Sequence, residues 1–358
     1  MDLKAAAWMV RSLGQGVSCV HLLKNGAVLA GGWDGRLTMW DNEGNTLWTA
    51  ETGQRISDMA VDGSILVVTS GLDLVAFDLE SGEMAWSVAL EGSADEVRWW
   101  EGDILAVSSV YDIEHNDFLE SAIWCFTKDG SQQWVNRMDE RPWALVAHEE
   151  RLYAGLGRPR CGWLLVDGEA PFDHVLPPTS FPVTCGTSGQ TRALFGQTDG
   201  TVVAHTGDVI STEQGAVEFL SCLPSGYAVS TDQGALSVNE PDGTNLWSHQ
   251  GNPLTAQTQG PLLEQGPTLW VSRRDGLNSN LIIYHASSGA QLAQAAFGLI
   301  HSMDSQEKRT VVGCEDGEVV VWDAELLSRR LSNAEVKTSE PLDERKAALQ
   351  AKLRALRG

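Results

Sequence analysis

The sequence predicts an all-β protein, a closed β-propeller of eight four-stranded blades, with seven blades as the alternative, and a C-terminal α-helix. Two observations lead to this prediction. A short apolar strand, closed by an aromatic or polar residue and a turn, recurs eight times at intervals of 34 to 49 residues. The chain of 358 residues also contains 36 glycines and 14 tryptophans, many of which mark this repeat. A period near 40 residues is typical of propellers.

Each repeat resolves into four expected strands. The recurring third strands are centred on Trp40, Phe77, Phe126, Val166, His205, Asn239, His285 and Trp322. An apolar second strand precedes each, often through a tight turn such as Asp34-Gly35, where glycine tolerates the positive φ that a two-residue hairpin needs. A first strand, such as 17–23, lies before it, and a fourth strand, often with a tryptophan, lies after it. Four strands per unit correspond to one propeller blade.

The two ends of the repeat array are expected to meet. The last repeat has no evident fourth strand, whereas residues 6–10 form an isolated apolar segment at the start of the chain. Pairing of 6–10 into the last blade would close the ring and remove two exposed strand edges. The propeller is therefore expected to span 1–331.

After the repeats, residues 332–341 read as a polar linker and 342–357 as an amphipathic helix of strong helix formers. Residues 334–358 carry six basic and four acidic groups. The leucines expected to form one apolar face are Leu342, Leu349, Leu353 and Leu356. This face would pack back on the propeller, dock on a partner or self-associate.

Several segments resemble known repeat families. The pairs Trp40-Asp41 and Trp322-Asp323 resemble WD40 repeats, and 76–86, 125–134 and 239–247 resemble quinoprotein-type (PQQ-like) repeats. The resemblance covers about residues 6–332 and implies a propeller. The tryptophans at equivalent places are expected to pack between blades: Trp40, Trp48, Trp86, Trp134, Trp247 and Trp322.

Composition limits the kinds of partner. A formal net charge of −23, spread along the chain, argues against binding to nucleic acid or anionic membranes. The six cysteines form no CxxC pair, so no zinc or redox site is expected. Residues 1–14 do not read as a secretory signal, and a cytoplasmic location is expected. The oligomeric state does not follow from the sequence.

Two insertions, 111–120 and 273–280, interrupt the regular blades between second and third strands. All such loops, and the loops between blades, emerge on one face of a propeller, where binding residues are commonly carried. The candidate rim residues are Arg36, Arg55, Tyr111, His115, Phe118, Arg141, Arg158, Arg160, Arg273 and Arg274. A protein or peptide partner is expected. Because arginine binds carboxylates through a planar fork, an acidic partner is one alternative. The other is that acidic residues on the same loops, such as Asp139 and Glu140, screen the arginines and leave no net positive patch.

No metal site is predicted. Asp112, Glu114, His115 and Asp117 offer ligand atoms, but their order does not match a calcium-binding EF-hand loop. No cofactor is predicted either.

The function expected from these features is that of a non-catalytic protein-interaction scaffold, and no catalytic residue is named. The alternative is a quinoprotein-like or other propeller enzyme with a site in the central funnel. Quinone-using members of the family have a secretory signal, calcium-holding residues and often a vicinal cysteine pair, none of which can be matched here. The chain also resembles bacterial outer-membrane assembly propellers, but Cys19 follows no apolar signal region of the kind that precedes a lipid-bearing cysteine.

Overall fold

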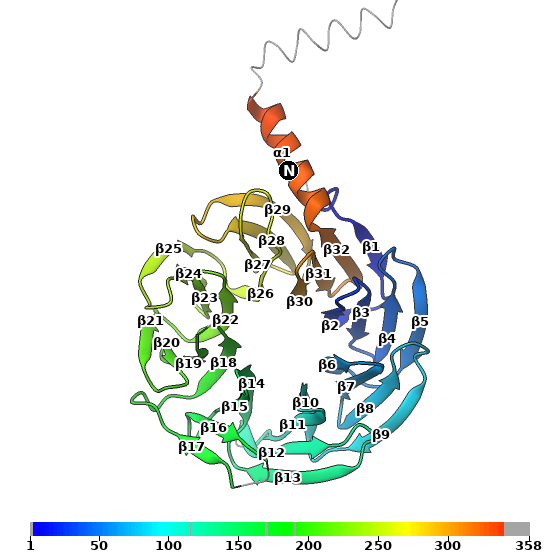
Figure 1. Cartoon of the computed structure of the whole chain (residues 1–358), viewed down its shortest axis with the longest axis vertical. Helices are drawn as coiled ribbons and strands as arrows, with labels where there is room; N and C mark the ends of the chain where they lie inside the picture. Colours follow the sequence, from blue (N-terminus) through cyan, green and yellow to red (C-terminus); the bar gives the residue numbers. More distant parts are fainter. Residues whose placement is uncertain (1–2, 115, 169–170, 190, 340–358) are drawn as a thin grey trace, which may run out of the picture.

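A computed structural model describes residues 3–114, 116–168, 171–189 and 191–339 (Figure 1). In this part of the chain, 32 strands form eight four-stranded sheets, and one helix follows the last strand. The sheets are arranged as the blades of a ring, each with its first strand nearest the ring axis (Figure 1). The expected eight-bladed propeller with a C-terminal helix is confirmed.

The strands are given in order from the axis outward. Blades 1 to 4 consist of β2 (Val17–Leu22), β3 (Val28–Gly32), β4 (Arg36–Trp40) and β5 (Thr46–Glu51); β6 (Ile56–Asp62), β7 (Ile65–Ser70), β8 (Asp73–Asp78) and β9 (Met84–Ala89); β10 (Ser93–Trp100), β11 (Asp103–Asp112), β12 (Asp117–Phe126) and β13 (Gln132–Met138); β14 (Pro142–His148), β15 (Arg151–Leu156), β16 (Trp163–Val166) and β17 (Asp173–Val175).

Blades 5 to 8 consist of β18 (Val183–Ser188), β19 (Ala193–Gln197), β20 (Thr201–Ala204) and β21 (Val209–Thr212); β22 (Val217–Leu223), β23 (Gly226–Thr231), β24 (Ala235–Asn239) and β25 (Asn245–Gln250); β26 (Leu254–Gln259), β27 (Thr268–Asp275), β28 (Asn278–His285) and β29 (Gln291–Gly298); β30 (Ile300–Gln306), β31 (Arg309–Cys314), β32 (Glu318–Asp323) and β1 (Met9–Ser12).

The hydrophobic core forms eight clusters, one at each junction between neighbouring blades. A second strand such as β7 is buried along nearly its whole length, because its blade packs against a neighbour on each side. This double burial explains why the middle strands read as continuous apolar runs instead of alternating polar and apolar residues. The loops are therefore carried by a scaffold that is packed all the way around.

Fourth-strand tryptophans join successive blades. The indole Nε1 of Trp48 donates to the carbonyl of Leu79 in the next blade at 2.9 Å, and Trp247 donates to Ala286 at 2.7 Å. Gly82, at φ 73°, lies so close to Trp48 that a Cβ there would stand 2.5 Å from the ring. This turn therefore requires glycine for two reasons: its backbone is left-handed, and the Trp48 ring is stacked too closely on it to leave room for a Cβ. The expected packing role holds for these tryptophans.

The N-terminal segment closes the ring. Strand β1 pairs with β32 in antiparallel register, Met9 opposite Val321 and Ser12 opposite Glu318. The strand lies about three residues later than the expected 6–10, because residues 3–6 form a turn that Trp322 holds through a 2.8 Å hydrogen bond from its Nε1 to the Leu3 carbonyl. The N-terminal segment therefore supplies the outermost strand of the last blade.

The C-terminal helix begins much earlier than the sequence suggested. Helix α1 (Ala324–Ser339) follows β32 directly and projects outward from the ring (Figure 1). The expected boundary at 331 and linker at 332–341 are thus wrong up to residue 339. Asp323 Oδ1 accepts hydrogen bonds from the backbone of Glu325 and Leu326, an N-terminal cap that starts the helix as soon as the blade ends.

Packing against the propeller fixes the first turns of α1. Leu327 and Leu331 are buried with Leu3 in the cluster at the junction of blades 7 and 8. Ser328 Oγ also accepts a hydrogen bond from the backbone N–H of Glu264, which lies in a loop of blade 7. The expected helix at 342–357, with its four leucines, lies outside the described residues. No helix in the described ranges is long and apolar enough to cross a membrane.

Candidate functional site

The blade 3 insertion is a hairpin that stands above its own blade. Strand β10 pairs with β11 only up to Ser109, and β13 pairs with β12 only as far as Ser121. Beyond these points β11 and β12 pair with each other alone, Val110 opposite Glu120 and Tyr111 opposite Phe118, with Leu119 of β12 bulged out between these pairs. The hairpin therefore rises on the face that carries the second-to-third-strand loops and the loops between blades, here called the loop face.

Aromatic rings and an arginine stack between this hairpin and blade 4. Tyr111 and Phe118 meet edge to face with ring centroids 5.2 Å apart, and Phe118 and Trp143 do so at 5.7 Å. The Arg141 guanidinium carbon lies 4.2 Å from the Phe118 ring centre and 4.1 Å from that of Trp143. Contacts of this kind between a cation and a ring face are attractive, more so when partly shielded from water. The stack holds the hairpin against blade 4.

Bulges in the innermost strands aim these side chains at the loop face. In every blade the pairing of first and second strands shifts register near the start of the first strand, for example between Ala94 and Glu96 and between Pro142 and Ala144. The residues bulged out at these two places are Asp95 and Trp143. Asp95 Oδ1 lies 3.3 Å from Arg141 Nη2, so the arginine bridges both bulges. Burial lowers the pKa of Arg141, and the nearby Asp95 and Glu96 carboxylates oppose this shift.

An open groove of about 730 Å³ extends from this stack across blades 4 to 6. Tyr111, Trp143 and Phe181 line it, with 47%, 42% and 46% of their surfaces exposed. Glu218 lies at the far end, and burial, with Asp232 nearby, raises its pKa. The groove thus presents large apolar surfaces to solvent beside a few polar groups, the composition typical of protein-binding hot spots.

The structure brings together four of the predicted rim residues: Tyr111, Phe118, Arg141 and Arg158 line this one groove. Arg158 Nη2 lies 3.4 Å from Asp117 Oδ2 on the hairpin. Trp143 and Phe181 were missed by sequence reasoning. Trp143 lies in a first strand, where no repeated motif marks it, and Phe181 lies in a loop whose neighbours in space belong to other blades.

Other predicted rim residues lie apart from the groove. Arg36 and Arg55 lie on blades 1 and 2, where Arg55 stacks on Trp33 with its guanidinium carbon 4.0 Å from the ring centre. Arg160 lies beside the groove, its Nη1 4.0 Å from Glu140 Oε2. Arg274 is exposed on blade 7. His115 lies outside the described residues.

Arg273 is a correction to the predicted rim, because it is buried, with 7% of its surface exposed. Its Nη1 donates to the carbonyls of Gly234 at 2.8 Å and Asn252 at 2.7 Å, which joins blade 7 to blade 6. Burial lowers the pKa of this arginine. Arg273 therefore holds the scaffold together and does not offer its guanidinium to a partner.

Acidic side chains near the ring axis also serve the scaffold. Asp58 Oδ2 accepts a hydrogen bond from the backbone of Val97 in the next blade, and Glu96 Oε1 accepts one from Leu145. Ser302 makes the equivalent contact with Val20 in blade 1. Burial, reinforced by the Asp58 carboxylate, raises the pKa of Glu96 to about 7. These groups occupy the same position after the bulge and connect neighbouring inner strands.

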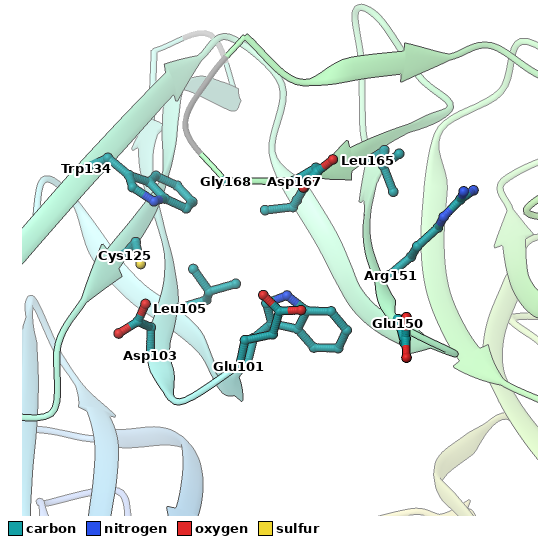
Figure 2. Close-up of a pocket in the computed structure, with 12 residues that line it drawn as sticks. Glu101, Asp103, Leu105, Cys125, Trp134, Glu150, Arg151, Leu165, Asp167 and Gly168 are labelled. Atoms are coloured by element: carbon teal, nitrogen blue, oxygen red, sulfur yellow. The ribbon is translucent and has the colours of Figure 1, made fainter.

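A second cavity, of about 240 Å³, lies on the opposite face between blades 3 and 4 (Figure 2). Trp134 borders it, with Glu101, Asp103 and Asp167 (Figure 2). In the described residues Trp134 Nε1 makes no hydrogen bond to blade 4, unlike the other fourth-strand tryptophans, and its ring meets Phe172 edge to face at 5.5 Å. The cavity therefore lies beside a fourth-strand tryptophan for which the described residues provide a ring contact and no indole hydrogen bond.

Metal and thiol chemistry have little support in the described ranges. No group of three or more histidine, cysteine, aspartate or glutamate side chains is arranged to hold a metal ion there. All six cysteines are free, and burial raises the pKa of Cys125 and Cys185 to about 12. Such thiols are poor nucleophiles and poor ligands.

Comparison with known proteins agrees with this architecture. A family model described as outer membrane protein assembly factor BamB, of the PQQ-like type, matches residues 6–165. This match covers blades 1 to 3 and most of blade 4, and these blades are similar to PQQ-like propeller repeats. A search of curated protein sequences gives no match.

Solved propellers cover most of this repeat array. BamB from Moraxella catarrhalis aligns with a TM-score of 0.71 and 17% identity over 88% of this chain and 99% of its own. Sqt1 from Saccharomyces cerevisiae aligns with a TM-score of 0.68 and 12% identity over 89% and 99%. The computationally designed protein Ika8 aligns with a TM-score of 0.64 and 16% identity over 87% and 98%. At these identities the likeness shows the fold alone.

Proposed function

We propose that this propeller is a non-catalytic protein-interaction scaffold whose docking site is the groove between the blade 3 hairpin and blades 4 to 6. The observation that carries the proposal is the stack of Tyr111, Phe118, Arg141 and Trp143 at the mouth of that groove. Tryptophan, tyrosine and arginine are the residues most enriched at the energetic centres of protein interfaces. The match to a family described as an assembly factor supports the same role.

The polar groups near the ring axis support the non-catalytic part of the proposal. The carboxylates of Asp58 and Glu96 accept hydrogen bonds from backbone N–H groups of the next blade. A cytoplasmic location, and a second contact surface formed by the C-terminal leucines, remain predictions from the sequence.

The experiment that tests the docking site uses two matched positions. Ile113, at the tip of the blade 3 hairpin, and Leu277, at the tip of the blade 7 hairpin, have 85% and 87% of their surfaces exposed on the same loop face. A photo-crosslinking amino acid is placed at each in turn, and the full chain is irradiated in its native host. A discrete adduct of the same protein, formed from position 113 and absent from 277, is expected. Equal adducts from both positions, or none from 113, would contradict the proposed site.

A further inference from the structure

The upper part of the blade 3 hairpin leaves one strand edge uncovered. Strand β13 ends at Met138, opposite Ser121, and the chain then turns toward blade 4. Strand β12 continues past this point from Glu120 to Asp117, paired on its other side with β11. Among the described residues, no strand pairs with this outer edge. Unpaired N–H and C=O groups along a strand edge are a template for a further strand.

Apolar side chains surround this edge. Leu119 has 47% of its surface exposed and Ile113 has 85%. Phe118, on the same segment, faces Trp143 and Arg141 of the groove. In the described residues the indole N–H of Trp143 donates no hydrogen bond within the chain. The backbone N–H of Phe118 donates to Asp117 Oδ1 at 2.9 Å, a contact that an incoming strand would replace if this group faces the outer edge. A strand added beside β12 would find backbone partners along the edge and aromatic surface for its alternate side chains.

The charges of the site decide between partners. The groove arginines are already neutralised: Arg141 lies 3.3 Å from Asp95 and Arg158 lies 3.4 Å from Asp117. Arg160, beside the groove, faces Glu140 at 4.0 Å. The whole chain carries a net charge of −23, which repels an acidic segment at distances of about a Debye length or less. Of the two alternatives that the sequence left open, the ion pairs therefore favour screened arginines over a site for an acidic partner.

We infer that the partner segment is an extended strand that pairs with the Asp117–Glu120 edge of β12, inserts apolar or aromatic side chains into the groove, and carries neutral or basic flanking residues. This inference rests on the proposed function, because it names the class of partner for the same groove. Main-chain pairing supplies affinity in such complexes, and alternate side chains supply specificity.

The test uses a phage-displayed library of random twelve-residue peptides selected on the full chain. Peptides that bind are expected to be enriched in aromatic and branched apolar residues at alternate positions and depleted in aspartate and glutamate. In complex with such a peptide, amide hydrogen exchange within Asp117–Glu120 should slow by about tenfold or more. Leu119→Pro, which removes one backbone N–H of the Asp117–Glu120 segment, and Trp143→Ala should each weaken binding by about tenfold or more, and Leu277→Ala should not.

The possible outcomes distinguish a failure of the strand-pairing inference from a failure of the proposed docking site. Peptides that depend on Trp143 but are acidic, or that leave the exchange of Asp117–Glu120 unchanged, would overturn the inference and leave the groove as a docking site. Peptides that bind the Trp143→Ala protein as tightly as the original would overturn both, and so would a selection that yields no binder.

Discussion

The hairpins of blades 3 and 7 are insertions at the same point of the repeat, yet they differ in what surrounds their backbone. In blade 7, β29 continues beside the hairpin to pair Gly298 with Asn278, and Ser279 Oγ accepts a hydrogen bond from Ile300 of the next blade. In blade 3, β13 ends below the hairpin at Met138. One insertion is thus built into the scaffold, and the other leaves an edge and an aromatic groove open to solvent.

Arg273→Ala should give the largest effect on stability in this comparison. The buried guanidinium serves two backbone carbonyls of blade 6 and its connection to blade 7, and its removal leaves them unsatisfied. We expect the free energy of unfolding to fall by about 3 kcal/mol, with peptide binding to the groove retained in the folded fraction. Urea unfolding followed by tryptophan fluorescence measures this. A loss below about 0.5 kcal/mol would mean that the blade 7 hairpin is not structural.

Trp143→Ala and Phe181→Ala should act on binding more than on folding. Each removes an exposed aromatic wall of the groove, and a central aromatic contact contributes about 2 kcal/mol or more to binding at interfaces. The dissociation constant of a selected peptide should rise about tenfold or more by fluorescence polarisation. Leu277→Ala, on the blade 7 hairpin, is the matched control and should leave affinity unchanged. An equal loss of affinity in Leu277→Ala would contradict the assignment of binding to the blade 3 hairpin and its groove.

Glu96→Gln should change the pH dependence of stability, because burial raises the pKa of this blade 3 carboxyl to about 7 from its ordinary value of 4.5. Between these pH values the unfolded chain releases the proton that the folded protein holds, so the folded state loses stability as the pH rises. Glutamine keeps the oxygen that accepts the Leu145 N–H and removes the titration.

We therefore compare the free energies of unfolding of Glu96→Gln and the original protein. Their difference should change in favour of Glu96→Gln by on the order of 2 kcal/mol as the pH rises from 4.5 to 8. Urea unfolding across this pH range measures the difference. The equivalent residue of blade 7 is Ala256, so Ala256→Ser provides a variant without a titrating group. A constant difference between Glu96→Gln and the original at every pH would contradict the assigned pKa.

Ile113→Lys should have the smallest effect on stability. The side chain has 85% of its surface exposed, so a change within about 0.5 kcal/mol is expected, as it is for Leu277→Lys. Thermal unfolding measures both. A loss above 1 kcal/mol at 113 alone would show that the tip of the blade 3 hairpin packs on the scaffold as the blade 7 hairpin does.

Much of the architecture was readable in the sequence because local chemistry repeats. Turn glycines such as Gly82, and the tryptophans stacked on them, mark blade after blade at a regular period. The helix start was misread for a local reason: Asp323 ends a strand motif and at the same time caps α1. The candidate site was only half readable. Tyr111 and Phe118 belong to an evident insertion, whereas Trp143 and Phe181 come from two other blades.

The sequence by itself determined the propeller class, the four-strand unit and the two insertions, because each depends on residues close together in the chain, and it favoured eight blades over seven. The ring of eight sheets was decided by the tertiary structure. The tertiary structure decided which insertion is open. Arg273 and Arg141 look alike in the sequence, yet one is buried under backbone carbonyls and the other is stacked between two rings. That difference arises from where neighbouring strands end and where inner-strand bulges aim their side chains, and these are properties of blades packed against one another.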